Sequence, residues 1–190
     1  MTQTLLNFLY RYFLFMKNDK IILKGKLKVK NKPLVNILDG SSLVIGDNVT
    51  LNSKNSKYHI NMFAPVKIYI DKMGAKISIG NNTRIHGSCL HAYKSIEIGA
   101  NCLIAANCQI FDGSGHDISL DDPSKRIVSK GAIKPIIIGN NCWIGTLSII
   151  LPGTTLGNNC IVAAGSVVSG EYKDNSLIGG NPAKFIKLIK

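Results

Sequence analysis

Aliphatic residues recur every sixth position along the second half of the chain. The unbroken series is Ile138, Ile144, Ile150, Leu156, Val162 and Val168. The residue two positions before each of them is mostly small, and Gly followed by Asn often comes after it. A period of six fits neither the 3.6-residue turn of a helix nor a hairpin meander. It is typical of a short strand and a turn repeated around a solenoid, with three such units in each coil and the aliphatic side chain inside.

The same six-residue frame occurs upstream, at Ile98, Ile104 and Ile110, and again at Ile79 and Ile85. Counting six from Ile85 places His91 at an inward position. The five cysteines then all fall two residues before an inward position, at Cys89, Cys102, Cys108, Cys142 and Cys160. We therefore expect small core residues there and neither disulfides nor a metal site. With no CxxC pair and no secretory signal, the expected location is the cytoplasm.

The repeat breaks between Ile110 and Ile138, whose separation of 28 residues is not a multiple of six. About one extra segment must therefore leave the solenoid as a loop, over residues 111–135. Long loops commonly carry function. This one contains the string DGSGHD, with Asp112, His116 and Asp117. A histidine between glycine and aspartate on an extruded loop has no core to pack into, so His116 is a candidate for chemistry.

Composition and charge limit the classes of partner. The 190 residues suit one domain, and 45% hydrophobic against 18% charged residues excludes a disordered chain. A formal net charge of +12 favours anionic partners. The lysines are spread along the chain without a known nucleic-acid-binding module, which argues against nucleic acid.

The N-terminal residues 1–40 differ from the rest. The segment LLNFLYRYFLFM is strongly apolar but is interrupted by Arg11, and a lysine run follows it from Lys17 to Lys32. No stretch reaches the roughly 20 apolar residues of a membrane span. We expect a helix and a lead-in here. The helix either packs on the body or on another subunit, or lies on an anionic membrane surface at the inner face of the membrane.

The repeats and two motifs resemble the hexapeptide-repeat acyltransferases, enzymes with a left-handed parallel β-helix that transfer acetyl groups from acetyl-CoA. The motifs are PIIIGNNCWIG, which starts at Pro135, and GGNPAK, which ends at Lys184. The branch with the greatest similarity contains maltose, galactoside and polysaccharide O-acetyltransferases. The resemblance implies a β-helix domain over residues 41–178 with an active-site loop, and a CoA-contacting tail over residues 179–190. The left-handed sense is implied by the family alone.

The resemblance also implies roles for single residues. His116 matches the general base that removes a proton from the acceptor hydroxyl. Asp112 and Asp117 are alternative candidates for orienting it, His86 is a candidate for acceptor binding, and the backbone N–H of Thr146 would stabilise the oxyanion. Trp143 would line the groove for the pantetheine arm. The implied CoA contacts are Trp143, Gly145, Thr146, Ala163, Ala164, Ser169, Lys184 and Lys187, and no metal is implied.

The sequence therefore predicts an acetyl-CoA-dependent O-acetyltransferase that acts on a hydroxyl of a sugar or surface polysaccharide. The resemblance implies a homotrimer in which His116 of one subunit meets Trp143 of its neighbour. Two alternatives stay open at this stage. One is N-acetylation of an amino sugar carried on a nucleotide, and the other is a solenoid scaffold without catalysis.

Overall fold

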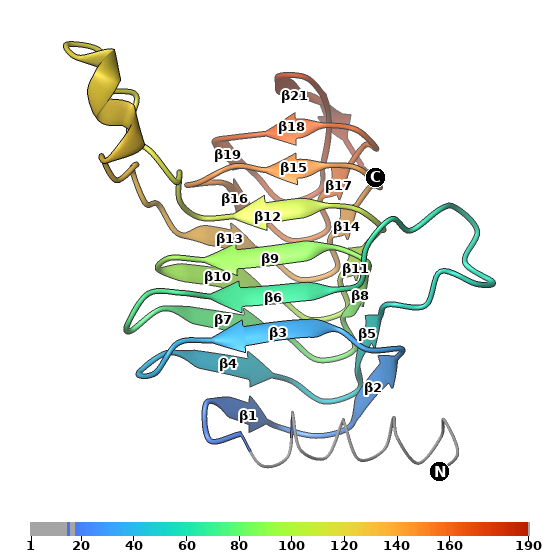
Figure 1. The fold of residues 1–190 in the computed structure, drawn as a ribbon. Coiled ribbons are helices and arrows are strands. Elements are labelled where there is room, and N and C mark those ends of the chain that lie inside the picture. Colours follow the sequence, from blue (N-terminus) through green and yellow to red (C-terminus); the bar gives the residue numbers. More distant parts are fainter. Residues whose placement is uncertain (1–14, 16–17, 190) are drawn as a thin grey trace.

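The chain winds into successive coils, each made of three short strands that contribute to three parallel sheets (Figure 1). The computed structural model describes Phe15 and residues 18–189. The helix expected near the N-terminus lies outside the described residues, except for Phe15, which is buried in the core. In the described part of the chain, no helix is long and apolar enough to cross a bilayer.

The three sheets, named A, B and C here, run the length of the solenoid. Sheet A contains β1 (Ile21–Leu23), β4 (Ser42–Ile45), β7 (Lys76–Ile79), β10 (Ser95–Ile98), β13 (Ile136–Ile138), β16 (Thr155–Leu156) and β19 (Glu171–Tyr172). Sheet B contains β2 (Leu27–Lys30), β5 (Val49–Asn52), β8 (Arg84–His86), β11 (Leu103–Ile104), β14 (Trp143–Ile144), β17 (Ile161–Val162), β20 (Ser176–Gly180) and the antiparallel β21 (Ala183–Leu188). Sheet C contains β3 (Leu34–Ile37), β6 (Lys67–Ile70), β9 (Cys89–Ala92), β12 (Gln109–Phe111), β15 (Ile149–Ile150) and β18 (Val167–Val168).

The six-residue pattern is confirmed by the core. All six aliphatics of the series from Ile138 to Val168 are at most 1% exposed, and they lie in register with their equivalents in neighbouring coils. In several coils the small residue two positions before the inward aliphatic donates to the next coil. Cys102 Sγ lies 3.1 Å from the carbonyl oxygen of Gly139, and Cys142 Sγ lies 3.1 Å from that of Gly157. The four cysteines from Cys102 to Cys160 are buried and free, as predicted.

The prediction for Cys89 and His91 is wrong by one residue. Leu90, five residues after Ile85, is fully buried and takes the inward position, while Ser88 takes the small position and donates from Oγ to the carbonyl of Ala105 at 2.7 Å. The turn at Gly87 is one residue shorter than its equivalents. Cys89 and His91 consequently lie on the outer surface, and His91 stacks between Tyr69 and Tyr93 there.

A ladder of asparagines supports the corner between sheets A and B. Its members share a positive φ, and each side-chain amide donates to the next side-chain oxygen: Asn48, Asn82, Asn101, Asn141, Asn159 and Asn175. Asparagine tolerates the left-handed region better than residues without a short polar side chain. The repeated Gly-Asn-Asn turns therefore combine a backbone requirement with a hydrogen bond from coil to coil.

Replacing Asn101 tests this ladder. Asn101→Ala removes the bonds of 3.1 Å to both Asn82 and Asn141 and leaves a Cβ at φ 58°. We expect the free energy of unfolding in urea to fall by about 1–3 kcal/mol. Asn101→Gly loses the bonds without the backbone strain, so it should lose less. Equal stability of wild type and the alanine variant would contradict the proposed role of the ladder.

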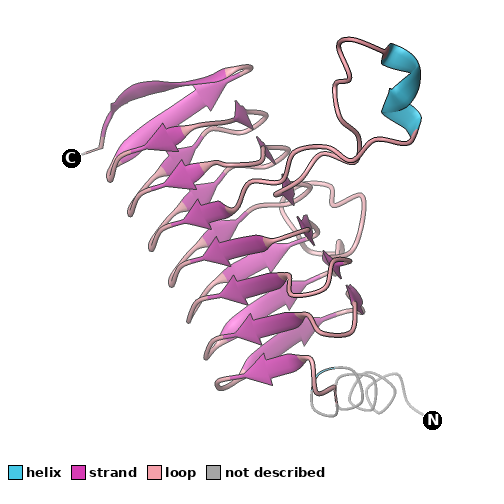
Figure 2. Cartoon of the chain, turned by 90° about the vertical axis from the view of Figure 1, so that its left-hand side faces the viewer, coloured by secondary structure: helices cyan, strands magenta, loops and turns pink. Residues whose placement is uncertain are grey.

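Two segments leave the solenoid (Figures 1 and 2). One, residues 112–135 between β12 and β13, is the predicted loop, and it contains the short 3-10 helix η2 (Pro123–Ile127). The other, residues 53–66 between β5 and β6, was not predicted. The solenoid also starts earlier than the expected boundary at residue 41, because β1, β2 and β3 pair with β4, β5 and β6 as a complete first coil. The predicted tail, residues 179–190, contains the whole of β21, which adds an antiparallel strand to sheet B.

Candidate active site

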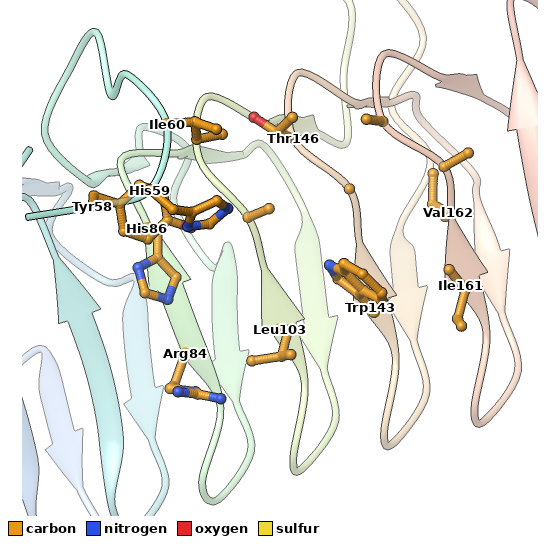
Figure 3. Close-up of a pocket in the computed structure, with 14 residues that line it drawn as sticks. Tyr58, His59, Ile60, Arg84, His86, Leu103, Trp143, Thr146, Ile161 and Val162 are labelled. Atoms are coloured by element: carbon orange, nitrogen blue, oxygen red, sulfur yellow. The ribbon is translucent and has the colours of Figure 1, made fainter.

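The outer face of sheet B, called the B face here, carries a cavity of about 530 Å³ (Figure 3). Parallel register aligns Arg84, Leu103, Trp143 and Ile161 in one outward column across β8, β11, β14 and β17. Side chains from loop 53–66 form a second wall. The lining residues are Tyr58, His59, Ile60, Arg84, His86, Leu103, Ala105, Trp143, Gly145, Thr146, Ile161, Val162, Ala163 and Ala164.

Six residues singled out in the sequence meet in this cavity: His86, Trp143, Gly145, Thr146, Ala163 and Ala164. Ser169 does not line it; this exposed residue follows β18 on sheet C. Lys184 and Lys187 lie on β21, where they pair with Gly179 and Leu177 of β20. Directly paired residues share one face of a sheet, so both lysines lie on the B face beyond the cavity.

The floor of the cavity is apolar, and the turn residues Gly145, Ala163 and Ala164 within it have little or no side chain. Trp143 is 51% exposed and lies between Leu103 and Ile161 in the column. A Cβ on Gly145 would come within 2.5 Å of the Ala164 nitrogen, so the coils approach closely there. Such a floor suits an extended apolar chain lying against the backbone.

Thr146 offers an unused backbone donor. Its Oγ1 donates to the carbonyl of Ala106 at 2.7 Å, which fixes the side chain. Its backbone N–H, by contrast, donates to no acceptor within the described residues, although the neighbouring Gly145 N–H bonds to the carbonyl of Val162. A fixed N–H at a cavity wall is the kind of group that stabilises a developing oxyanion.

His86 is held as a neutral hydrogen-bond donor. The Oδ1 atom of Asn52 accepts from the backbone N–H of Lys54 at 3.0 Å, so the Asn52 Nδ2 atom faces His86 Nδ1, 3.1 Å away. Nδ1 therefore accepts and Nε2 carries the proton. Burial, helped by the positive charges of Arg84 and Lys30, lowers the pKa of His86 to about 4. A ring with this pKa is a poor general base and a suitable donor to a substrate oxygen.

This assignment predicts a specific acid sensitivity. Between the ordinary histidine pKa of 6.5 and about 4, the unfolded chain binds a proton that the folded His86 does not, so acid lowers stability in that range. We expect the unfolding free energy of the wild type to fall further than that of His86→Gln, by about 1 kcal/mol after allowing for the partial exposure of the ring. Parallel pH profiles, or an NMR titration midpoint of His86 near 6.5, would contradict the assignment.

His116 lies away from this cavity. It is exposed on loop 112–135, and that loop leaves the solenoid at the corner between sheets C and A. Its backbone carbonyl accepts from Ser114 Oγ at 2.8 Å. The catalytic candidate and the cavity residues are therefore not brought together within one described chain.

The two aspartates proposed as partners of His116 make other bonds. Asp112 is fully buried, and its carboxylate accepts the backbone N–H groups of Tyr93, Lys94 and Ser95 at 2.6–2.7 Å. It holds the start of the loop against β10. Asp117 Oδ2 accepts from the backbone N–H of Ser119 at 3.3 Å. Neither carboxylate bonds to the ring of His116 in the described residues.

Loop 53–66 supplies cavity residues that the six-residue repeat does not predict. The Tyr58 ring lies 4.8 Å from that of His86 and 4.6 Å from that of His59, measured between centroids. Asn107 anchors the loop, accepting from the N–H of Phe63 at 2.9 Å and donating to the carbonyl of Asn61 at 2.8 Å. The interrupted frame after Leu51, together with the Asn- and Ser-rich stretch that follows, was the available signal.

Two family descriptions match the chain. "Bacterial transferase hexapeptide (six repeats)" matches residues 135–170, and "Hexapeptide repeat of succinyl-transferase" matches residues 76–111. The WbbJ protein of Escherichia coli strain K12, named as a putative lipopolysaccharide biosynthesis O-acetyl transferase, is 30% identical over 146 residues, which are 72% of this chain and 73% of WbbJ. The chain belongs to the hexapeptide-repeat acetyltransferase family.

Other relatives match over less of their length. The galactoside O-acetyltransferase of Escherichia coli is 33% identical over 61% of this chain and 56% of the relative. The chain spans as little as 36% of the length of another curated relative. Among solved structures, a point mutant of AntD, an N-acyltransferase from Bacillus cereus in complex with dTDP and coenzyme A, superposes with a TM-score of 0.70 at 20% identity, covering 100% of this chain and 90% of AntD. This likeness establishes the fold, the left-handed parallel β-helix.

Proposed function

We propose that the protein is an acetyl-CoA-dependent O-acetyltransferase that acts on a saccharide hydroxyl. The observation that carries the proposal is the cavity on the B face, which combines an apolar floor at Trp143 with the unused N–H of Thr146. Family membership and the names of WbbJ and of the galactoside relative support O-acetyl transfer to a sugar.

The residues present fit acetyl-CoA. The turns at Gly145 and Ala163 consist of small residues and leave room for the pantetheine arm beside Trp143. Lys184 and Lys187 extend the same face at its C-terminal end. Lysine ammonium groups suit phosphates. We infer that the phosphates bind near β21 and that the thioester lies close to Thr146.

In this site His116 would accept the proton of the acceptor hydroxyl as its oxygen attacks the acetyl carbonyl carbon. The N–H of Thr146 would donate to the carbonyl oxygen as negative charge develops there. The carbon–sulfur bond then breaks, and the proton held by His116 passes to the leaving sulfur. No covalent bond to the protein is required. His86 would donate from Nε2 to an acceptor oxygen.

The position of His116 supports a site shared between copies of the chain. Four aliphatic side chains of loop 112–135 are exposed by 67–83%: Ile118, Leu120, Ile127 and Val128. A contiguous loop with so much uncovered apolar surface is typical of a segment that packs on another protein. We infer that it packs on a second copy and delivers His116 to that copy's cavity, in a closed homotrimer.

The lysines of β21 give a direct test of CoA binding. Lys184→Ala together with Lys187→Ala should weaken acetyl-CoA binding by about tenfold or more, because charge-assisted bonds to phosphate are lost. Calorimetric titration measures this change. The double variant Lys76→Gln and Lys173→Gln, exposed elsewhere, matches the change in charge and should bind like the wild type. Unchanged affinity in the β21 variant would overturn the phosphate assignment.

An amine could replace the hydroxyl, since the same base and N–H donor serve both. An assay of acetyl transfer, measured as release of free CoA, should therefore offer glucosamine as well as methyl galactoside as acceptors. Release of free CoA with glucosamine alone, with the acetyl group found on its nitrogen, would move the assignment to N-acetylation and leave the CoA site unchanged.

A further inference from the structure

The B face is cationic at both ends and apolar in the middle. At the C-terminal end, Lys184 and Lys187 lie opposite β20. The middle carries Leu103, Trp143 and Ile161. At the N-terminal end, β2 pairs with β5 and β5 with β8, which brings Lys28, Lys30 and Arg84 to the same face. Under the proposed function the phosphates of acetyl-CoA account for the first cationic end. They do not account for the second.

A second cavity, which we call the basic trough, lies at the N-terminal end. Its volume is about 830 Å³, within the range of roughly 300–1,000 Å³ for small-molecule sites. It is lined by Val29, Lys30, Asn31, Asn52, Lys54, Asn55, Ser56, Lys57, Tyr58 and His86. Tyr58 and His86 also line the first cavity, so the two cavities adjoin at these side chains.

The lining of the basic trough is suited to an anion. It contains three lysines and three asparagines, Val29 is its one aliphatic residue, and none of its residues is acidic. Lys30, Lys54 and Lys57 are exposed, and the described residues give none of them an ion-pair partner. The positive field extends to the boundary of the cavities, since the charges of Lys30 and Arg84 help to lower the pKa of His86.

An extended ligand can enter both cavities, which adjoin at Tyr58 and His86. β2, which carries Lys30, and β14, which ends just before Thr146, are four strand spacings apart, which is about 19 Å at roughly 4.8 Å each. His86 presents its Nε2–H donor between the trough and the proposed acetyl site. An acceptor whose hydroxyl reaches toward Thr146 would therefore place another part of the same molecule beside the lysines.

We propose that the basic trough binds an anionic group, a phosphate or a carboxylate, on the saccharide acceptor, and thereby selects charged over neutral acceptors. This inference rests on the proposed function for the identity of the first cavity. Lys54 and Lys57, both on loop 53–66, would bind the anion together with Lys30, and His86 would bind a sugar oxygen.

Binding of small saccharides to the purified full chain tests the proposal without turnover. The probes are glucose 1-phosphate, glucuronate and methyl glucoside, titrated in the presence of CoA at fixed ionic strength. We expect one or both anionic probes to bind about tenfold or more tighter than methyl glucoside. Tighter binding of glucose 1-phosphate alone identifies a phosphorylated acceptor, and tighter binding of glucuronate alone identifies an acidic glycan.

Matched variants locate the effect. Lys54→Gln with Lys57→Gln should abolish the preference for the anionic probe, whereas Lys76→Gln with Lys173→Gln should retain it. Equal binding of all three probes, or an equal loss in both double variants, would overturn the proposal. Binding of CoA itself is recorded in the same titrations. Normal CoA binding without a preference for anionic probes refutes only the proposal that the basic trough binds an anion. Absence of CoA binding refutes the proposed function.

Discussion

His116→Ala should lower turnover by about 10²–10⁴-fold, the usual contribution of a positioned general base. The reason is that His86, which lines the cavity, is not suited to replace it as a base. His86 is neutral, and its Nδ1 lone pair already accepts from Asn52. The measurement is release of free CoA from acetyl-CoA, with methyl galactoside, glucose 1-phosphate and glucuronate supplied as acceptors.

Two controls separate chemistry from binding. His116 is exposed, so the variant should fold and should bind acetyl-CoA with unchanged affinity in a calorimetric titration. His59→Ala, on the wall of the cavity, should affect the Michaelis constant more than turnover. Wild-type turnover of His116→Ala with normal CoA binding would show that the base lies elsewhere.

Mixed oligomers should recover activity that neither parent has. Ala164 is exposed and lines the cavity, so Ala164→Trp should fill the cavity without disturbing the core. Alone, this variant and His116→Ala should both be almost inactive. Coexpressed in equal amounts, they should regain about a quarter of wild-type activity. In a site shared between copies, about half of the loops carry His116 and about half of the cavities are open, so both are intact in about a quarter of the sites.

The same experiment discriminates between shared and internal sites. If His116 served the cavity of its own chain, each subunit would carry one defect and mixing would restore nothing. The control is the double variant with both changes in one chain, expressed alone. It should be inactive whether the site is shared or internal. Activity of the mixture no greater than the sum of the two parents would reject the shared site.

The repeat made the fold predictable from the sequence, and it did so because the constraint is local. Each inward aliphatic, from Ile138 to Val168, stacks on its equivalent one coil away, so a period in the sequence becomes a period in space. The small donors at Cys102 and Cys142 follow the same period.

The errors occur where this period fails. The short turn at Gly87 shifts the frame by one, which moves His91 outward and Leu90 inward. The first coil is an exception, because its inward residues Leu23, Val29 and Val35 keep the six-residue spacing, but the lysines between them obscure the pattern. A one-residue change in a turn reverses which side chains are buried, and a six-residue count cannot detect it.

The candidate site was predictable in part. Trp143, Gly145 and Thr146 follow from the motif within the regular coils, and they do line one cavity. Tyr58 and His59 come from loop 53–66, whose path depends on the anchor at Asn107, about forty residues away in sequence. Contacts between residues so far apart in the sequence depend on the folded coil and produce no periodic pattern in the sequence. The proposed meeting of His116 with the cavity would depend on a second copy, which the sequence of one chain does not position.

The most direct test of the account is calorimetric titration of the purified protein with acetyl-CoA, compared with dephospho-CoA, while light scattering gives the mass of the same sample. We expect saturable binding at about one site per subunit of a trimer, with weaker binding of dephospho-CoA because a phosphate contact is lost. A monomer that binds neither ligand would contradict both the acetyltransferase assignment and the shared site.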